Sequence, residues 1–390
     1  MSALNFETVI VGAGPAGCAC ALELLRLGHS CCIVDKRTFP RDKLCGGLFT
    51  DKASKALEGI VGTAGLARIL KESQCVQESR FVLCNGTKEI VSCNPERHIR
   101  LVDRRRFDKA LLDAVVLEGG MVITGEEIAS VDFDARCIKS RSGLEIGYDY
   151  LVAADGALST VRRLTGDNRK KHHRQPSLCL EINVDVKDYS CDGVCIYFGI
   201  VPKSYAWTFP KGDKTCIGLV KLPDTDFDVN STFRKFLEEL HVNNIDSYPF
   251  KGAMIPIDCC PKRPVYGEHV LFVGDAAGLV QSLTGEGIYY AISSGRDAAD
   301  SIVGASSMRP DVRYVHHISR YRHMMHLASV YQRMLLEWGA GTEFLLKHAS
   351  SHLNFIRHFY DTQIDQEPTL GPVSLFTRWY LYKLKKRHGW

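Results

Sequence analysis

The fold of this chain is decided by residues 8–17, which read Thr-Val-Ile-Val-Gly-Ala-Gly-Pro-Ala-Gly. The first four are apolar or β-branched and predict a strand, and residues 18–27 have helical composition without a breaker. A second strand over residues 31–34 ends in Asp35, 21 residues after Gly14. A strand, a glycine-rich turn, a helix and a second strand closed by an acid together predict a dinucleotide-binding βαβ unit.

Each residue type in this unit has a physical role. Gly12 permits the tight turn, Gly14 lets the backbone approach a diphosphate, and Gly17 lets the helix pack closely on the strand. The diphosphate would lie at the helix N-terminus near Ala16, where free N–H groups and the helix dipole favour an anion. Asp35 would accept hydrogen bonds from the ribose of an adenosine. At this point NAD and FAD both remain open.

Two later segments favour FAD. Residues 149–163 contain a strand that ends at Asp155, followed by the serine-capped start of a helix. Residues 270–287 contain another apolar strand, which runs into Asp275 and then into small residues. A carboxylate just past a strand end, beside a helix N-terminus, is well placed to hydrogen-bond a polyol such as the ribityl chain of a flavin.

Together these segments resemble the FAD-dependent oxidoreductases of the aromatic-hydroxylase superfamily, and more narrowly their geranylgeranyl reductase branch. Members of that branch carry a Cys-Gly-Gly turn near the flavin, as at residues 45–47 after Arg41. Residues 205–210, Tyr-Ala-Trp-Thr-Phe-Pro, match the branch's Tyr-x-Trp-x-Phe-Pro signature along the substrate cavity. Arg104 begins a pattern that opens a helix packed on FAD in this superfamily. The resemblance covers residues 7 to about 305.

The resemblance implies an α/β fold: a Rossmann-like FAD-binding domain with an inserted antiparallel β-sheet substrate domain and a C-terminal helical region. The expected boundaries are 1–75, 100–165 and 265–305 for the discontinuous FAD-binding domain, 76–99 and 166–264 for the substrate-binding sheet domain, and 306–390 for the helical region. Strand composition supports the inserted sheet over residues 178–186, 193–199, 204–209, 215–220 and 251–257. A helix is expected over residues 288–305.

FAD is expected to bind without a covalent link, against residues from several separate segments. The cofactor-binding residues that the motifs and the resemblance imply are Gly12, Gly14, Ala16, Gly17, Asp35, Lys36, Arg41, Cys45, Gly46, Gly47, Arg104, Asp155, Gly274, Asp275, Gly285, Gly287 and Ile288. Residues 284–287 precede a helix, and their backbone N–H groups would face the flavin pyrimidine edge, where negative charge develops on reduction.

The candidate catalytic residues are Cys45 and Tyr205, and the candidate substrate-binding residues are Tyr205, Trp207 and Phe209. The three aromatic residues alternate, so they point to one face of a strand. Such a stripe often belongs to a core, but the resemblance favours a wall that buries a bulky apolar substrate. Cys45 precedes a Gly-Gly turn that permits close approach to the flavin. One interpretation makes its thiol a proton donor or redox partner of the flavin. The other makes Cys45 a small residue selected only because it fits.

The activity implied is reduction of carbon–carbon double bonds in an apolar, isoprenoid substrate of the geranylgeranyl type, with hydride from flavin N5 and a proton. The sequence contains no evident strong acid for that proton. The alternative is a flavin-dependent monooxygenase or halogenase acting on an aromatic or apolar small molecule. A second glycine-rich dinucleotide unit is not visible, so the expected electron donor is NAD(P)H or a reduced ferredoxin-type carrier.

The composition is that of an ordinary globular enzyme, with 45% hydrophobic and 24% charged residues. A net charge of +4 is too small to indicate a nucleic-acid partner. An apolar run long enough to span a bilayer and a basic leader are both missing, so a cytoplasmic protein is expected. The fifteen cysteines are not spaced as metal ligands, and no metal site is expected.

Residues 376–390 combine aromatic side chains with five Lys or Arg and no acid. A helix of this kind fits two arrangements. It can lie on an anionic membrane surface, or it can pack its aromatic side on the enzyme and leave its lysines in water. The expected partners are therefore an apolar or lipid substrate, a membrane surface contacted peripherally, and an electron-donor protein.

Overall fold

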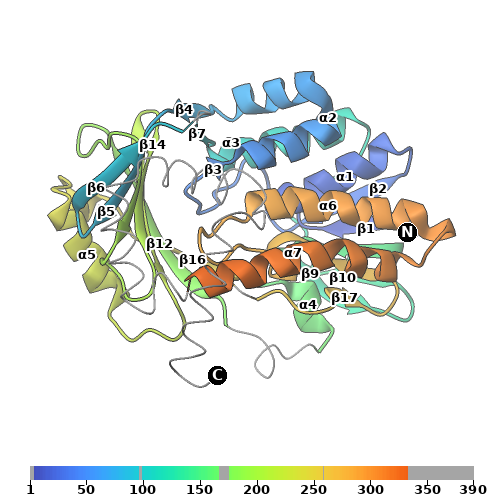
Figure 1. The fold of residues 1–390 in the computed structure, drawn as a ribbon. Coiled ribbons are helices and arrows are strands. Elements are labelled where there is room, and N and C mark those ends of the chain that lie inside the picture. The colour runs from blue at the N-terminus through green and yellow to red at the C-terminus, as the bar shows by residue number, and fades with distance from the viewer. Residues whose placement is uncertain (1–3, 96–98, 167–174, 258, 333–390) are drawn as a thin grey trace.

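The computed structural model describes residues 4–95, 99–166, 175–257 and 259–332. Figure 1 shows two separate sheets. The sheet that holds β1 lies among the helices α1, α2, α3, α6 and α7, and the sheet that holds β12 and β14 stands at the other end of the molecule. None of the described helices is both long and apolar enough to cross a membrane.

The first sheet has eight strands, and its core is parallel. Its main order is β17-β18-β11-β1-β2-β8, and β10 and β9 continue from β11 by antiparallel pairing. The parallel strands are β1 (Leu4–Val11), β2 (Cys31–Asp35), β8 (Met121–Thr124), β11 (Glu145–Ala153) and β18 (Val270–Phe272). The antiparallel strands are β9 (Ile128–Asp132), β10 (Cys137–Ser140) and β17 (Val265–Tyr266). Parallel strands expose their carboxyl ends along one edge, where α/β folds bind ligands.

Helices bury this sheet. They are α1 (Pro15–Arg26), α2 (Asp51–Glu72), α3 (Arg104–Leu117), the short α4 (Thr160–Leu164) and α6 (Ile288–Val303). Pro15 is suited to the first turn of α1, because the N–H that it lacks would have no helical partner there. α1 and α6 approach closely at Gly295, where a Cβ would lie 2.2 Å from the carbonyl oxygen of Ala16. The expected serine cap is confirmed, because Ser159 Oγ accepts a hydrogen bond from the Arg162 N–H at 3.0 Å.

The second sheet has seven strands in the order β16-β12-β15-β14-β13-β5-β6. They are β5 (Phe81–Asn85), β6 (Lys88–Cys93), β12 (Ser177–Asp185), β13 (Val194–Phe198), β14 (Ala206–Lys211), β15 (Lys214–Lys221) and β16 (Lys251–Ile255). All neighbouring pairs are antiparallel except β13 and β5. α5 (Val229–Glu239) covers one face, and the other face turns toward the first sheet. The predicted fold class is confirmed.

Three short strands, β3 (Leu48–Phe49), β4 (Val76–Glu78) and β7 (Ile99–Leu101), form a third sheet. The helix predicted over 288–305 is α6, which gives way to a 3-10 turn at Gly304–Ser306.

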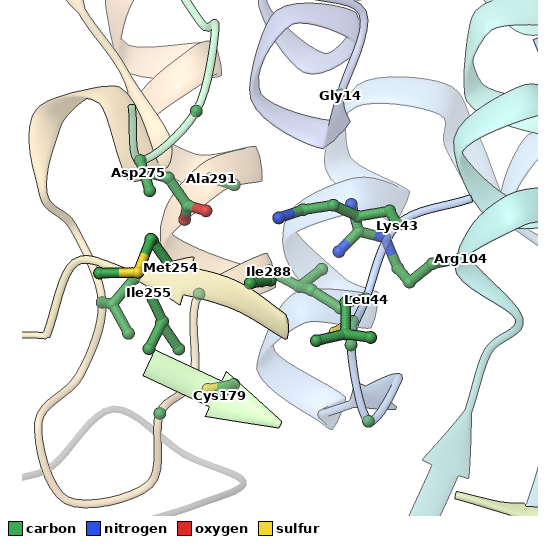
Figure 2. A pocket seen from close by; sticks show the side chains of 18 of the residues that line it. Gly14, Lys43, Leu44, Arg104, Cys179, Met254, Ile255, Asp275, Ile288 and Ala291 are labelled. Atoms are coloured by element: carbon green, nitrogen blue, oxygen red, sulfur yellow. The ribbon is translucent and has the colours of Figure 1, made fainter. Parts of the chain in front are cut away.

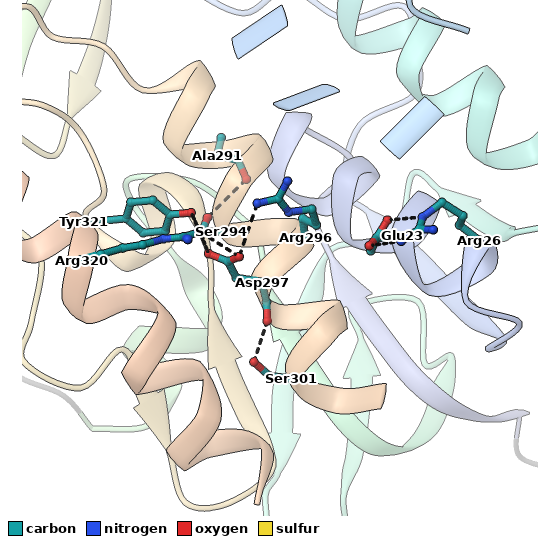
Figure 3. A network of polar contacts seen from close by, with 9 residues as sticks. All are labelled: Glu23, Arg26, Ala291, Ser294, Arg296, Asp297, Ser301, Arg320 and Tyr321. Atoms are coloured by element: carbon teal, nitrogen blue, oxygen red, sulfur yellow. Dashed lines mark hydrogen bonds and ion pairs between the residues drawn. The ribbon is translucent and has the colours of Figure 1, made fainter. Parts of the chain in front are cut away.

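Figure 3 shows how α7 (Pro310–Gln332) is fastened to α6. The buried carboxylate of Asp297 accepts hydrogen bonds from Arg320 Nη2 at 3.0 Å and from the Tyr321 hydroxyl at 2.7 Å. The predicted basic, aromatic helix over 376–390 lies outside the described residues.

Candidate functional site

A cavity of about 990 Å³ lies between the two sheets. This volume is at the upper end of the roughly 300–1,000 Å³ that is usual for ligand sites. Figure 2 shows Gly14 and Arg104 on one side of it, Cys179, Met254 and Ile255 on the second sheet, and Asp275 and Ile288 beside α6. Of the predicted site residues, all but Gly17 and Gly274 line this cavity. Their contacts with FAD stay predictions.

The glycine-rich turn is packed so tightly that its shape depends on missing side chains. Gly12 has a φ of +109°, and a Cβ there would lie 2.4 Å from the carbonyl oxygen of Ala154. A Cβ on Gly17 would lie 1.9 Å from the carbonyl oxygen of Gly12. Gly17 therefore acts by packing rather than by facing the ligand. No side chain among the described residues caps α1 at its N-cap, Gly14, so the first N–H groups of the helix can bind an anion.

Asp35 closes β2 beside this turn. Its Oδ2 accepts a hydrogen bond from the Ala13 N–H at 2.7 Å, and its Oδ1 accepts one from the Arg37 N–H at 2.8 Å. These two bonds fix the orientation of a carboxylate that is nearly buried. A carboxylate has about four acceptor positions, so two remain for ribose hydroxyls. Lys36 follows it along the same wall of the cavity.

Two arginines share one buried carboxylate at the diphosphate end. Arg104 binds Asp108 through Nε at 2.7 Å and Nη2 at 3.0 Å, and Arg41 Nη2 lies 3.1 Å from the same carboxylate. Burial opposes the charge on Arg104, but Asp108 and the Cys45 thiol outweigh it, so its pKa lies above the ordinary value. Arg41 Nη2 lies 3.6 Å from the position of a Cβ on Gly14. Two cations against one anion leave a net positive charge where the diphosphate is expected.

Two further acids face the cavity. Asp155 Oδ2 accepts a hydrogen bond from the Val161 N–H at 3.1 Å, whereas its buried Oδ1 has no hydrogen-bond partner within the described part of the chain. Burial also raises the pKa of Asp155. Figure 2 shows the Asp275 carboxylate reaching into the cavity, where its Oδ1 lies 3.4 Å from the Cβ position of Gly287. An orphaned buried oxygen and an inward carboxylate both suit a polyhydroxylated ligand.

The Cys-Gly-Gly turn is held in place from three sides. Cys45 Sγ accepts a hydrogen bond from the Gly47 N–H at 3.4 Å, and the Cys45 carbonyl oxygen accepts one from Lys211 Nζ at 2.7 Å. A Cβ on Gly46 would lie 2.6 Å from the ring of Phe209. The turn therefore presents backbone rather than side chain between the aromatic wall and the first sheet.

The loop before α6 is also anchored. The Tyr205 hydroxyl donates a hydrogen bond to the Thr284 carbonyl oxygen at 2.6 Å, and burial raises the pKa of this tyrosine. Glu286 accepts a hydrogen bond from the Thr50 hydroxyl at 2.7 Å and pairs with Lys52 Nζ at 2.5 Å. The first N–H groups of α6 have no side-chain cap and lie beside the cavity. Tyr205 would have to break its bond to act as a proton donor, so its catalytic role stays a prediction.

Sequence reasoning missed several residues of the cavity. Figure 2 shows Lys43 reaching into it from the side opposite Asp275. Glu181 and Cys179 line it from β12. An apolar arm follows the second sheet and is lined by Phe81, Leu83, Val91, Val194, Ile196 and Phe198. Alternation in each strand could have separated inward from outward residues, but it does not say which face meets the cavity.

These features define a protein that binds a dinucleotide between a Rossmann-like sheet and a second, antiparallel one. The comparison with known families agrees, because residues 5–303 match the family described as FAD binding domain. The chain therefore belongs to this family, and the protein is an FAD-dependent oxidoreductase, as predicted. The glycine cradle, the paired arginines and the orphaned Asp155 oxygen fit FAD.

Two relatives carry informative names. A menaquinone reductase of Mycobacterium tuberculosis is 27% identical over 316 residues, which cover 75% of this chain and 76% of the relative. A digeranylgeranylglycerophospholipid reductase of Methanothermobacter thermautotrophicus is 26% identical and is matched over 82% of each chain.

Two solved structures share the fold. A geranylgeranyl bacteriochlorophyll reductase-like protein of Thermoplasma acidophilum has a TM-score of 0.74 at 18% identity, over 96% of both chains. The halogenase PltM in complex with phloroglucinol and FAD has a TM-score of 0.72 at 14% identity, over 91% of this chain and 83% of PltM. The predicted resemblance to geranylgeranyl reductases is confirmed, while the fold alone is common to reductases and halogenases.

Proposed function

We propose that this enzyme saturates carbon–carbon double bonds in the prenyl chain of an apolar, isoprenoid substrate of the geranylgeranyl type. The observation that carries the proposal is the apolar arm of the cavity, whose lining residues are separate from those expected at the flavin. Phe81, Leu83 and Val91 line it from β5 and β6, and Ile196 and Phe198 line it from β13. A side pocket for one aromatic ring would not need walls from three strands.

The names of the relatives support a prenyl chain as the shared feature. Menaquinone and a digeranylgeranylglycerophospholipid differ in their head groups, and both carry an isoprenoid chain. Burial of such a chain stabilises binding by roughly 25 cal/mol for each Å² of apolar surface removed from water. We therefore assign the arm to the chain and leave the head group to the open end of the cavity.

When bound and reduced, FAD supplies the hydride for this reaction. The residues of the chain bind and orient. Arg41 and the free N–H groups of α1 hold the diphosphate, and Asp35 holds the adenosine ribose. Trp207 and Phe209 press the Cys-Gly-Gly turn from the side of the second sheet and exclude water from the reacting carbons. Exclusion of water strengthens every electrostatic interaction within the site.

The alternative function is a monooxygenase or halogenase acting on an aromatic or apolar small molecule. The fold that this chain shares with PltM favours it. The halogenase-type Trp-x-Trp-x-Ile-Pro signature is not found in this sequence, where residues 205–210 read Tyr-Ala-Trp-Thr-Phe-Pro. We further propose that electrons arrive from NAD(P)H or a reduced ferredoxin-type protein, and that the enzyme works in lipid metabolism beside a membrane.

One experiment separates the two functions. The purified FAD-loaded protein is reduced with dithionite under anaerobic conditions and mixed with a geranylgeranyl lipid in detergent. We expect the flavin absorbance to return only when lipid is present, with two hydrogens gained by the product for each double bond saturated. Reoxidation by oxygen with an oxygenated or halogenated product, and none by the lipid, would support the alternative instead.

A further inference from the structure

One buried carboxyl group on the second sheet faces the cavity. Glu181 lies on β12, is 2% exposed and lines the cavity wall. The residues next to it, Leu180 and Ile182, belong to the hydrophobic cluster on the opposite face, beneath α5. Because side chains alternate along a strand, Glu181 points to the same face as Cys179. An acid on this otherwise apolar wall needs an explanation.

The carboxyl group has few polar partners. Its Oε1 accepts one long hydrogen bond, from Asn183 Nδ2 at 3.4 Å, and it forms no ion pair within 4.0 Å among the residues that the structure describes. The thiol of Cys216 is a second hydrogen-bond partner of the carboxyl group. The ammonium of Lys211 is within electrostatic range, although its hydrogen bond goes to the Cys45 carbonyl oxygen. The carboxyl group of Glu181 is therefore not held in a structural ion pair with any described residue.

The position of Cys179 places this acid at the reactive end of the cavity. Its thiol is within electrostatic range of Glu181, Cys45, Lys43 and Asp275 at once. Cys45 and Asp275 are among the residues expected at the flavin, so the groups around Cys179 converge where the cofactor and the reacting double bond meet. Glu181 follows Cys179 by two residues along β12, so the two side chains are neighbours on the same face of the strand.

The other groups at this end are poor acids. Burial raises the pKa of the Cys179 thiol to about 12, and Glu181 adds to the effect. Burial likewise raises the pKa of Cys216 well above its ordinary value. Burial opposes the charge on Lys211, but Cys216 and Glu181 outweigh it, so the pKa of this lysine is also raised. Burial raises the pKa of Tyr205, and its hydroxyl already donates a hydrogen bond to the Thr284 carbonyl oxygen.

We propose that Glu181 is the acid that protonates the substrate carbon during double-bond reduction, an assignment that rests on the proposed function. One alkene carbon accepts hydride from reduced FAD. The other carbon takes the proton of the Glu181 carboxyl group, so the O–H bond breaks as the new C–H bond forms. The alkene is reduced by two electrons, FAD is oxidised by two, and Glu181 is left as a carboxylate that regains a proton from water.

The decisive variant is Glu181→Gln, which keeps the size and an acceptor for Asn183 but has no acidic proton. We expect the rate of lipid-dependent reoxidation to fall about 10²- to 10⁴-fold, the usual contribution of positioned acid–base catalysis. FAD content and KM for the lipid should stay near those of the wild type. The limb of the wild-type pH–rate profile that reports this proton should vanish in the variant.

The matched control is Glu89→Gln, which removes a carboxylate from β6 of the same sheet. Glu89 is 45% exposed and pairs with Arg80, so this variant should retain the wild-type rate and pH profile. A second readout needs no lipid: an infrared C=O band of a protonated carboxyl group should appear in the difference spectrum between the wild type and Glu181→Gln, and should be missing from that between the wild type and Glu89→Gln.

The outcomes are distinguishable. Suppose that lipid reoxidises the wild type. If the rate of Glu181→Gln then stays within about fivefold of the wild-type rate, or if the difference spectrum lacks the Glu181 band at neutral pH, only the assignment of Glu181 is overturned. If lipid does not reoxidise the wild type, the proposed function fails and the assignment fails with it. Should Glu181→Gln lose its FAD or its thermal transition, Glu181→Asp replaces it. A shifted carboxyl band with slow but pH-dependent turnover would then support the assignment, and a wild-type rate without that dependence would overturn it.

Discussion

The two sheets build their halves of the cavity by different means. On the first sheet the cavity is shaped by backbone, because Gly12 and Gly17 admit no Cβ without a clash against a backbone carbonyl oxygen. On the second sheet it is shaped by side chains such as Trp207 and Phe209, which stand out from β14, a strand paired with β13 and β15. The first half can change little, whereas the second can be rebuilt for another ligand.

This difference has an energetic counterpart. A Cβ forced against a carbonyl oxygen can be relieved only if the βαβ unit moves, so the damage spreads to the whole nucleotide site. A shortened side chain on the cavity wall leaves a hole whose cost depends on its volume. Substitutions in the first sheet should therefore remove the cofactor, and those in the second should change stability and substrate use while FAD remains bound.

The largest effect is expected for Gly17→Ala. The new Cβ would lie 1.9 Å from the carbonyl oxygen of Gly12, which belongs to the backbone of the same turn. We expect the purified protein to contain almost no FAD, as measured by the flavin absorbance relative to protein. Gly59→Ala is the control, since apart from its own helical turn no described residue has an atom within 4 Å of its Cβ position in α2. It should keep FAD and gain about 0.5–1 kcal/mol of stability. A fully loaded Gly17→Ala protein would contradict this account of the cradle.

Trp207→Ala should have the next largest effect. The indole is 6% exposed and belongs to the hydrophobic cluster on the cavity face of the second sheet. We expect the free energy of unfolding to fall by about 3–5 kcal/mol and lipid-dependent reoxidation to weaken, with FAD content near that of the wild type. Trp207→Phe should cost less, because it keeps an aromatic ring and removes a buried indole N–H that finds no hydrogen-bond partner among the described residues. If FAD content instead falls together with the melting temperature, the indole ring supports the FAD site rather than the substrate wall.

Arg41→Gln tests the positive charge at the diphosphate. Its removal leaves Arg104 and Asp108 as a neutral pair, so the site loses its net charge. A hydrogen bond to a charged group contributes about 1.5–3 kcal/mol, and we expect the Kd for FAD, measured by titration of the cofactor-free protein, to rise about tenfold to hundredfold. Arg105→Gln serves as the control because Arg105 is 59% exposed and, within the described part of the chain, pairs with Asp42 alone, at 3.9 Å. An unchanged Kd for Arg41→Gln would place the diphosphate elsewhere.

The same contrast explains what the sequence could predict. The first βαβ unit is local: the turn at residues 12–17 and the acid at Asp35 lie within one short segment, and their spacing follows from the backbone alone. A dinucleotide-binding α/β fold could therefore be predicted from it, while the preference for FAD also needed the strand ends at Asp155 and Asp275. The helix α2 was not predicted, although Thr50 caps it with its hydroxyl.

The cavity wall was harder to predict because its members meet only in the folded chain. Glu181 looks in sequence like any charged residue on a strand, and only the packing of Leu180 and Ile182 beneath α5 shows that it faces inward. Lys43 lies within a recognised motif, yet nothing in its neighbours indicates which way the side chain points. Thus the nucleotide site, which backbone geometry forms, could be predicted from the sequence. Of the cavity wall on the second sheet, which side chains form, only the aromatic stripe could be predicted.

The smallest effect is expected for Cys45→Ser. The thiol accepts a hydrogen bond from the Gly47 N–H, and a serine hydroxyl can accept the same bond, while the Lys211 bond goes to the backbone carbonyl and is unaffected. With Glu181 as the acid, we expect the single-turnover rate of lipid reduction to change by less than about fivefold with FAD still bound. Cys45→Ala, which removes the acceptor, should be somewhat worse. A loss of about 10²- to 10⁴-fold in Cys45→Ser is the signature of acid–base chemistry. Such a loss would make the Cys45 thiol the proton donor. The acid–base chemistry would then come from the Cys-Gly-Gly turn rather than from Glu181 on the second sheet.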